Sequence, residues 1–216
     1  MSVLFHNKEA IYLIQQIIDA LDELTEGEGY FSIDQAVRVD NDLHLTLTMY
    51  KEVYGRTVGK HASWSIICED VRENNLGISS SFLYLRILRD HPVLFKYNKP
   101  YFRILGPEKM AENEKIYGQL FEELSNFLEK YNAVNRIHDF LSVQPGFTEG
   151  LISLTFGPQE IADIYRKVLE KESMQVTLQS YPIIHSDTGT EQILLFVNVE
   201  HSFYVVAEHF HITRMD

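Results

Sequence analysis

Apolar residues recur at helical spacing over residues 7–24. The apolar stripe consists of Ile11, Ile14, Ile17, Ile18, Leu21 and Leu24. The opposite face carries Gln15, Asp19, Asp22 and Glu23. This spacing predicts a one-sided amphipathic helix that packs on another element. Asn7 can cap the helix, and Gly27 and Gly29 can end it.

After Gly29 the pattern changes to the two-residue alternation of strands. Over residues 43–50, Leu and Met alternate with His, Thr and Tyr, and the turn-forming run Asp40-Asn41-Asp42 comes just before them. This arrangement predicts an antiparallel hairpin whose first strand covers residues 30–39. Further apolar stretches predict strands within residues 63–68, 76–88 and 101–105.

The second half of the chain has a different order of elements. Gly106-Pro107 is expected to open a long helix, because Pro suits the first helical position, and the helix can continue to Pro145-Gly146. A strand over 151–156 and a helix over 158–172 follow. The helix at 158–172 has the clearest apolar stripe, and together with a strand at 175–184 it can form a βαβ crossover. Strands at 192–199 and 203–213 complete the prediction.

This order predicts an α+β fold, with mainly antiparallel sheets and three amphipathic helices packed on them. The chain can divide near Gly106 into an N-terminal α+β half, residues 1–105, and a C-terminal α+β half, residues 106–216. The N-terminal half would be a helix followed by a meander. The C-terminal half would be a long helix, a βαβ unit and a hairpin. Two similar halves and one fused domain both fit, since no repeat in the residues decides between them.

The composition indicates a folded protein in a reducing compartment. Of the 216 residues, 45% are hydrophobic and 12% are aromatic, which is enough for a packed core. No apolar run is long enough to cross a membrane, and the first residues do not form a secretion signal. Cys68 is the single cysteine and cannot form a disulfide within the chain. We therefore expect a soluble, cytoplasmic protein that does not bind membranes.

The net charge of −12 restricts the partners. Such a field opposes nucleic acid, so a nucleic acid partner is not expected, whereas a basic protein would be attracted. The charge is uneven, since residues 1–85 carry −7, residues 86–138 carry +2 and residues 139–216 carry −7. The acidity can also serve solubility alone.

The mildly basic centre contains the first candidate site. Cations and aromatic rings are interleaved there, an arrangement that can hold an anion or stack the bases of single-stranded nucleic acid. The candidate ligand-binding residues are Arg86, Arg89, His91, Lys96, Tyr97, Lys99, Tyr101 and Arg103. Alternatively, these cations only neutralise nearby acidic helices, and His91, which precedes Pro92, has a structural role.

Histidines near the end of the chain form the second candidate site. His209 and His211 are two residues apart in an expected strand, so they share a face, and His201 comes shortly before it. Two imidazoles and a third ligand can bind zinc. The alternative is a His pair on a strand face without a metal.

No catalytic motif with the spacing of a nucleophile elbow, a dinucleotide-binding loop or paired Cys ligands is present, and no cofactor is predicted. The leading interpretation is therefore a non-catalytic, acidic protein-binding module, regulatory or immunity-like, that masks a basic partner. One alternative is a metal-dependent hydrolase that uses the His-X-His pair. Another is anion or single-stranded nucleic acid binding through residues 86–109.

Overall fold

The structure is a computed structural model that describes residue 17 and residues 29–76, 81–82, 84–110, 113–131, 133–142, 144–148, 150–181, 191–197 and 202–215. In these residues the chain forms three antiparallel sheets with helices, which confirms the α+β class. The predicted first helix lies outside the described residues except for Ile17, which is buried in a core.

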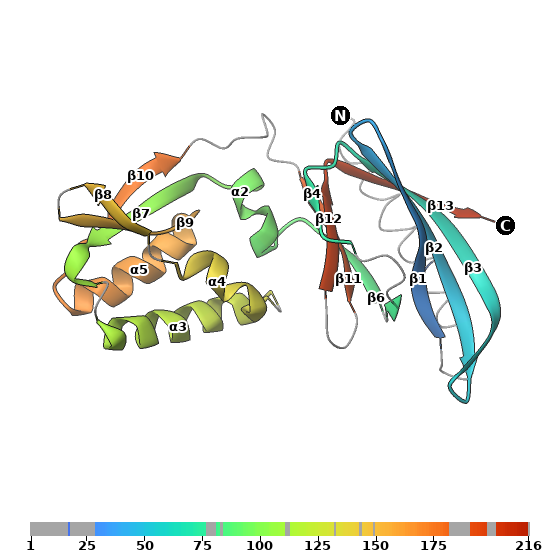
Figure 1. The fold of residues 1–216 in the computed structure, drawn as a ribbon, viewed down its shortest axis with the longest axis horizontal. Helices are drawn as coiled ribbons and strands as arrows, with labels where there is room; N and C mark the ends of the chain where they lie inside the picture. The colour runs from blue at the N-terminus through green and yellow to red at the C-terminus, as the bar shows by residue number, and fades with distance from the viewer. Residues whose placement is uncertain are drawn as a thin grey trace, which may run out of the picture. The chain divides into compact units, whose positions relative to one another are not determined.

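The chain divides into two compact units (Figure 1). Unit 1 comprises Met1–Arg89 and Glu191–Asp216, and unit 2 comprises Asp90–Thr190. Unit 1 therefore combines both ends of the sequence, and Gly106 lies inside unit 2. In the described residues the two units also differ in topology, since one contains two sheets and the other a single sheet with helices.

The larger sheet of unit 1 has the strand order β13-β3-β2-β1-β5. Its strands are β1 (Gly29–Val39), β2 (Asp42–Val53), β3 (Arg56–Glu69), β5 (Ser81–Phe82) and β13 (His209–Met215). β1 and β2 form the predicted hairpin, in which Ile33 pairs with Leu47. The turn between them contains Asp40 in a left-handed conformation, with φ of 54°, which short polar residues tolerate best.

The smaller sheet of unit 1 has the strand order β4-β12-β11-β6. Its strands are β4 (Glu73–Asn74), β6 (Tyr84–Leu88), β11 (Gln192–Val197) and β12 (Ser202–Ala207). Both sheets bury their apolar side chains in one core, to which the larger sheet contributes Leu47 and Trp64 and the smaller sheet Phe196 and Val205. Cys68 lies in the same core, where burial raises the pKa of its thiol and keeps it unreactive.

The single strand predicted over residues 203–213 is wrong, because two strands occupy this segment. β12 ends at Ala207 in the smaller sheet, and β13 begins at His209 in the larger sheet. Apolar alternation continues through both strands because both face the same core, and the chain changes sheets at Glu208 without any turn residue that would mark the change.

Unit 2 contains one sheet with the strand order β10-β7-β9-β8, in which every neighbouring pair is antiparallel. Its elements are β7 (Tyr101–Pro107), α3 (Glu114–Glu129), α4 (Ile137–Phe140), β8 (Gln144–Thr148), β9 (Leu151–Pro158), α5 (Gln159–Lys171) and β10 (Thr177–Tyr181). β9 and β10 flank β7 and run parallel to each other, which confirms the predicted crossover through α5. β7 and β8 likewise flank β9, run parallel to each other and are connected through α3 and α4. The unit therefore has the split βαβ, or ferredoxin-like, topology.

The helices of unit 2 cover one face of its sheet (Figure 1). Leu120, Leu124 and Leu128 of α3 pack with residues of α5 and with Ile104 and Leu154 of the sheet in a second core. Two of the three predicted helices, α3 and α5, are thus present and amphipathic. None of the helices in the described residues is both long and apolar enough to span a membrane.

Gly106-Pro107 does not open the predicted long helix, since only a short 3-10 helix, Glu108–Met110, follows it directly. Both residues extend β7, where Gly106 pairs with Ile152 of β9, and α3 begins only at Glu114 with Asn113 as its cap. A Cβ atom at Gly106 would lie 2.6 Å from the side chain of Leu154. The glycine therefore permits close packing in a strand, and the Gly-Pro pair does not signal the start of a long helix here.

The long helix also ends earlier than predicted. α3 stops at Glu129, and after it come a short 3-10 helix at Val134–Arg136 and α4. Ile137 of α4 continues the apolar pattern because α4 packs on the same core as α3. Pro145 and Gly146 lie in β8.

Candidate functional site

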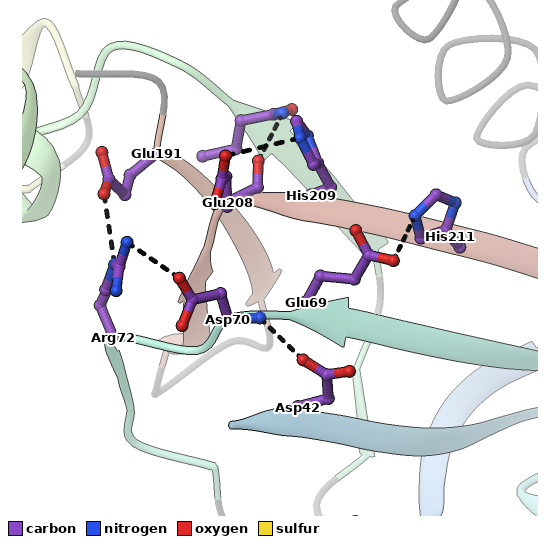
Figure 2. A network of polar contacts seen from close by, with 9 residues as sticks. Asp42, Glu69, Asp70, Arg72, Glu191, Glu208, His209 and His211 are labelled. Carbon is purple, nitrogen blue, oxygen red and sulfur yellow. Dashed lines mark hydrogen bonds and ion pairs between the residues drawn. The ribbon is translucent and has the colours of Figure 1, made fainter. Parts of the chain in front are cut away.

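The chain crosses between the two sheets of unit 1 twice, first after β3 on the way to β4 and again between β12 and β13. The two crossings lie together at a polar corner (Figure 2). At the first crossing, the backbone N–H of Val71 donates to the carbonyl oxygen of Asn41 over 2.9 Å. At the second, the N–H of Glu208 donates to the carbonyl oxygen of Glu69 over 3.0 Å. Because these bonds tie the first crossing to the turn before β2 and the second crossing to β3, the side chains at the corner project from a fixed backbone.

We call this region the acidic corner and define it by Asp42, Glu69, Asp70, Arg72, Glu191 and Glu208. Figure 2 shows Arg72 between two carboxylates, 3.0 Å from Asp70 and 3.3 Å from Glu191. The side chain of Glu191 is only 1% exposed, whereas those of Glu69 and Asp70 are 42% and 37% exposed. Carboxylates thus outnumber the single guanidinium, and the exposed ones give the corner a negative surface.

The candidate metal ligands lie beside this corner but face different carboxylates. His211 Nε2 is 3.0 Å from Glu69 Oε1, and His209 Nε2 is 3.8 Å from Glu208 Oε1. Both imidazoles are partly exposed, while the intervening Phe210 is buried. Within the described residues, no three His, Cys, Asp or Glu side chains form a group that could hold a metal ion. His201, the third candidate, lies outside the described residues.

The candidate basic stretch is divided between the two units. Arg86 and Arg89 belong to unit 1, and the other six candidate residues belong to unit 2. Lys96 and Tyr97 lie in α2 (Phe95–Asn98), where the Lys96 ammonium is 4.9 Å from the centre of the Tyr97 ring. Tyr97 is itself buried. The eight candidate residues are therefore shared between the two compact units.

His91 has a structural contact at the start of unit 2. Its Nδ1 accepts a hydrogen bond of 3.3 Å from the backbone N–H of Val93 and so caps the 3-10 helix Pro92–Leu94. Burial, and then the positive charge of Arg136, lower the pKa of His91 to about 4, and Asp90 only partly offsets this effect. A neutral, capping imidazole supports the structural interpretation of His91.

Lys99 is also held by structural partners. Its ammonium is 2.8 Å from Glu160 and 3.3 Å from Asp90, and lies 4.3 Å from the centre of the Phe95 ring. Burial lowers its pKa, but the hydrogen bond and charge of Glu160, together with Asp90, outweigh burial and raise it overall. These contacts fix the entry of the chain into unit 2.

The sheet of unit 2 places Arg103 beside two rings from distant parts of the sequence. Its guanidinium carbon is 5.0 Å from the centre of the Phe156 ring, which is 5.1 Å from the ring of Tyr181. Side chains alternate between the faces of a strand, so Arg103 lies on the face opposite to Ile104, which packs in the helix-covered core. Tyr101 donates to the carbonyl oxygen of Phe156 over 3.4 Å, and burial, followed by the charge of Asp139, raises its pKa to about 12.

Sequence reasoning missed Phe156 and Tyr181 because it considered only neighbours along the chain. Strand pairing brings them next to Arg103, and no local signal indicates that pairing. Glu69, Asp70 and Arg72 were missed as well, because they come together with Glu191 and Glu208 only where the chain passes from one sheet to the other.

Compared with models of known protein families, with curated proteins and with solved structures, the chain shows no significant match. The split βαβ topology of unit 2 hosts many unrelated functions, so topology alone assigns none.

Proposed function

We propose that the protein is a non-catalytic, acidic binding protein, regulatory or immunity-like, that masks a basic partner protein with the acidic corner. The observation that carries this proposal is the fixed backbone at the corner, which presents the partly exposed carboxylates of Glu69, Asp70 and Glu208 around a single Arg72. Of the net charge of −12, unit 1 carries −8 and unit 2 carries −4. A basic surface would therefore be steered toward the unit that contains the corner.

Preorganisation supports this choice. The Asp70 backbone N–H donates to Asp42 Oδ1 over 2.9 Å, and the Gln192 amide donates to the carbonyl oxygen of Glu208 over 3.2 Å. Carboxylates on a fixed backbone lose less conformational freedom on binding than carboxylates on a loose loop. Partly exposed charges such as these carboxylates mainly raise the association rate of a complex and the salt dependence of its binding.

The test compares two triple variants that remove the same charge. The corner variant is Glu69→Gln with Asp70→Asn and Glu208→Gln, and the control is Glu114→Gln with Glu122→Gln and Glu129→Gln on the exposed side of α3. Binding of a labelled peptide rich in Lys and Arg is measured by fluorescence anisotropy at low and physiological salt. We expect the corner variant to weaken binding by about tenfold or more, and the control to weaken it far less. Equal losses in both variants would reduce the effect to net charge and contradict the proposal.

A second candidate function is binding of an anionic, base-containing ligand on the face of the unit 2 sheet opposite its helices. It is favoured by the Arg103, Phe156 and Tyr181 cluster, because aromatic rings stack on bases and a guanidinium pairs with phosphate. A labelled oligothymidine should bind with an affinity that falls as salt rises. Tyr181→Leu and Arg103→Gln should each reduce that affinity, while Phe121→Leu, at an exposed position on α3, should not.

A further inference from the structure

The β2–β3 hairpin extends beyond the strands on both sides of it (Figure 1). β1 accompanies β2 only as far as the pair Gly29 and Lys51, and β13 accompanies β3 only from Ser63 onward. Among the described strands, the end of the hairpin is thus paired only with itself. Residues 54–61 are all exposed. We call residues 50–61 the β2–β3 arm.

The turn at the tip of the arm contains Tyr54, a residue whose backbone conformation is unfavourable for a large side chain. Tyr54 and Gly55 connect the paired residues Val53 and Arg56, and their φ angles are 50° and 72°. A two-residue hairpin turn with both φ angles positive prefers Asn-Gly, because a large side chain is strained in the left-handed region. Tyr54 is also 96% exposed. Its ring therefore adds strain without burial, a combination that points to a role outside folding.

The arm combines apolar and cationic side chains within an acidic protein. Lys51, Arg56 and Lys60 are opposed in the arm only by Glu52, although the whole chain carries −12. Val58 is 60% exposed. Tyr and Arg are among the residue types most enriched at the energetic centres of protein interfaces, so the tip has the composition of a contact surface for an acidic partner.

Contacts at the base hold the arm in position. The rings of Tyr30 and Tyr50 stack with their centres 5.5 Å apart, and the hydroxyls of Tyr30 and Thr57 are 3.1 Å apart. The hydroxyl of Tyr50 in turn donates to the carboxylate of Asp34 over 3.2 Å. An arm held in this way is ordered before it meets a partner, which lowers the entropic cost of binding.

We propose that the β2–β3 arm binds an acidic segment of a partner protein, with Tyr54 as the apolar anchor and Arg56 and Lys60 as the cations that pair with carboxylates. A second copy joined edge to edge fits less well, because the cations of two arms would repel each other. The register shift between Lys51 and Glu52 also distorts the edge. A long nucleic acid fits less well, because a polyanion that extends beyond the cationic arm would meet the acidic remainder of the chain, whereas a short acidic segment would not. The proposal concerns a surface separate from the acidic corner and does not depend on it.

The experiment uses the full chain and a short, fluorescently labelled peptide rich in Glu and Leu. A matched peptide with Lys in place of Glu and an oligothymidine serve as alternative ligands, and binding is measured by anisotropy. We expect the Glu peptide to bind through the arm, and the Lys peptide, which the acidic corner would attract, to bind independently of the arm. Tyr54→Asn should weaken binding of the Glu peptide by about tenfold, as is typical for an aromatic anchor, while the thermal midpoint stays the same or rises because Asn suits the turn.

Matched variants in unit 2 provide the controls. Phe121→Asn removes another exposed aromatic side chain, and Lys109→Gln with Lys130→Gln removes the same charge as Arg56→Gln with Lys60→Gln. The arm variants should weaken binding of the Glu peptide and the controls should not. Absence of Glu peptide binding, equal losses in arm and control variants, or tighter binding of an oligothymidine that the arm variants also weaken would each overturn the proposal.

Discussion

The hydroxyl of Tyr165 donates a hydrogen bond of 2.7 Å to the backbone carbonyl oxygen of Phe140. Both side chains are buried, at 1% and 2% exposure, so the bond joins α5 to α4 inside the core of unit 2. Burial is also the main reason why the pKa of Tyr165 is raised, which keeps the hydroxyl protonated as a donor. α4 is a single short turn, and this bond fixes its end against the longer helix.

Tyr165→Phe removes only the donor and leaves the Phe140 carbonyl oxygen buried. We expect a loss of about 1–2 kcal/mol in the free energy of unfolding, because a buried acceptor loses its partner. Urea unfolding followed by circular dichroism measures this loss. Tyr54→Phe removes a fully exposed hydroxyl and should change the unfolding free energy by less than about 0.5 kcal/mol. Similar effects of both substitutions would contradict the role of the Tyr165 bond.

Gly157 is expected to tolerate no side chain. A Cβ atom there would lie 2.8 Å from Cβ of Ile161, at the start of α5, where neither atom can rotate away. Gly157→Ala should therefore destabilise the protein by about 1–3 kcal/mol through overpacking. Gly118→Ala is the matched control, since nothing lies within 4 Å of its Cβ position in α3, and it should stabilise by about 0.5–1 kcal/mol. Relative to the original protein, the denaturant midpoint should fall in Gly157→Ala and rise in Gly118→Ala.

Sequence patterns predicted the elements whose neighbours are adjacent in the chain. The β1–β2 hairpin follows from alternation and turn chemistry, and α5 follows from an apolar stripe that includes Ile161 and Tyr165. The prediction was wrong at Gly106, where the reason for the glycine is a contact with Leu154 in another strand. Local propensity contains no information on such a contact.

The candidate sites were harder to predict for the same reason. Arg103 was identified from its own sequence neighbours, but its ring contacts come from Phe156 and Tyr181, which only sheet pairing brings close. His209 and His211 do share a strand, as expected, yet each faces a different carboxylate. Which partners surround a side chain is decided by the tertiary fold, and the spacing of residues in the sequence leaves it open.

His91 should make the protein less stable as the pH falls. Its folded pKa is lowered to about 4 from a usual value of 6.5, so between these values the unfolded chain takes up a proton that the folded chain does not. The stabilising contribution is complete above pH 6.5 and is lost toward pH 4, with a total of about 3 kcal/mol. His91→Asn keeps an acceptor for the Val93 N–H but removes the titration. The difference in unfolding free energy between the original protein and the variant should therefore change between pH 7 and pH 5, and parallel curves would contradict the assignment.

The two units should respond separately to substitutions in their cores. Trp64 is the only tryptophan and is fully buried in the core of unit 1, so its fluorescence reports on that unit, whereas circular dichroism reports on both. Leu120→Ala in unit 2 and Leu47→Ala in unit 1 each remove a fully buried side chain and should each cost about 2–5 kcal/mol. Leu120→Ala should lower a circular dichroism midpoint while the Trp64 midpoint stays unchanged, and Leu47→Ala should lower the Trp64 midpoint. A fall of the Trp64 midpoint in Leu120→Ala would show instead that both cores unfold in one cooperative step.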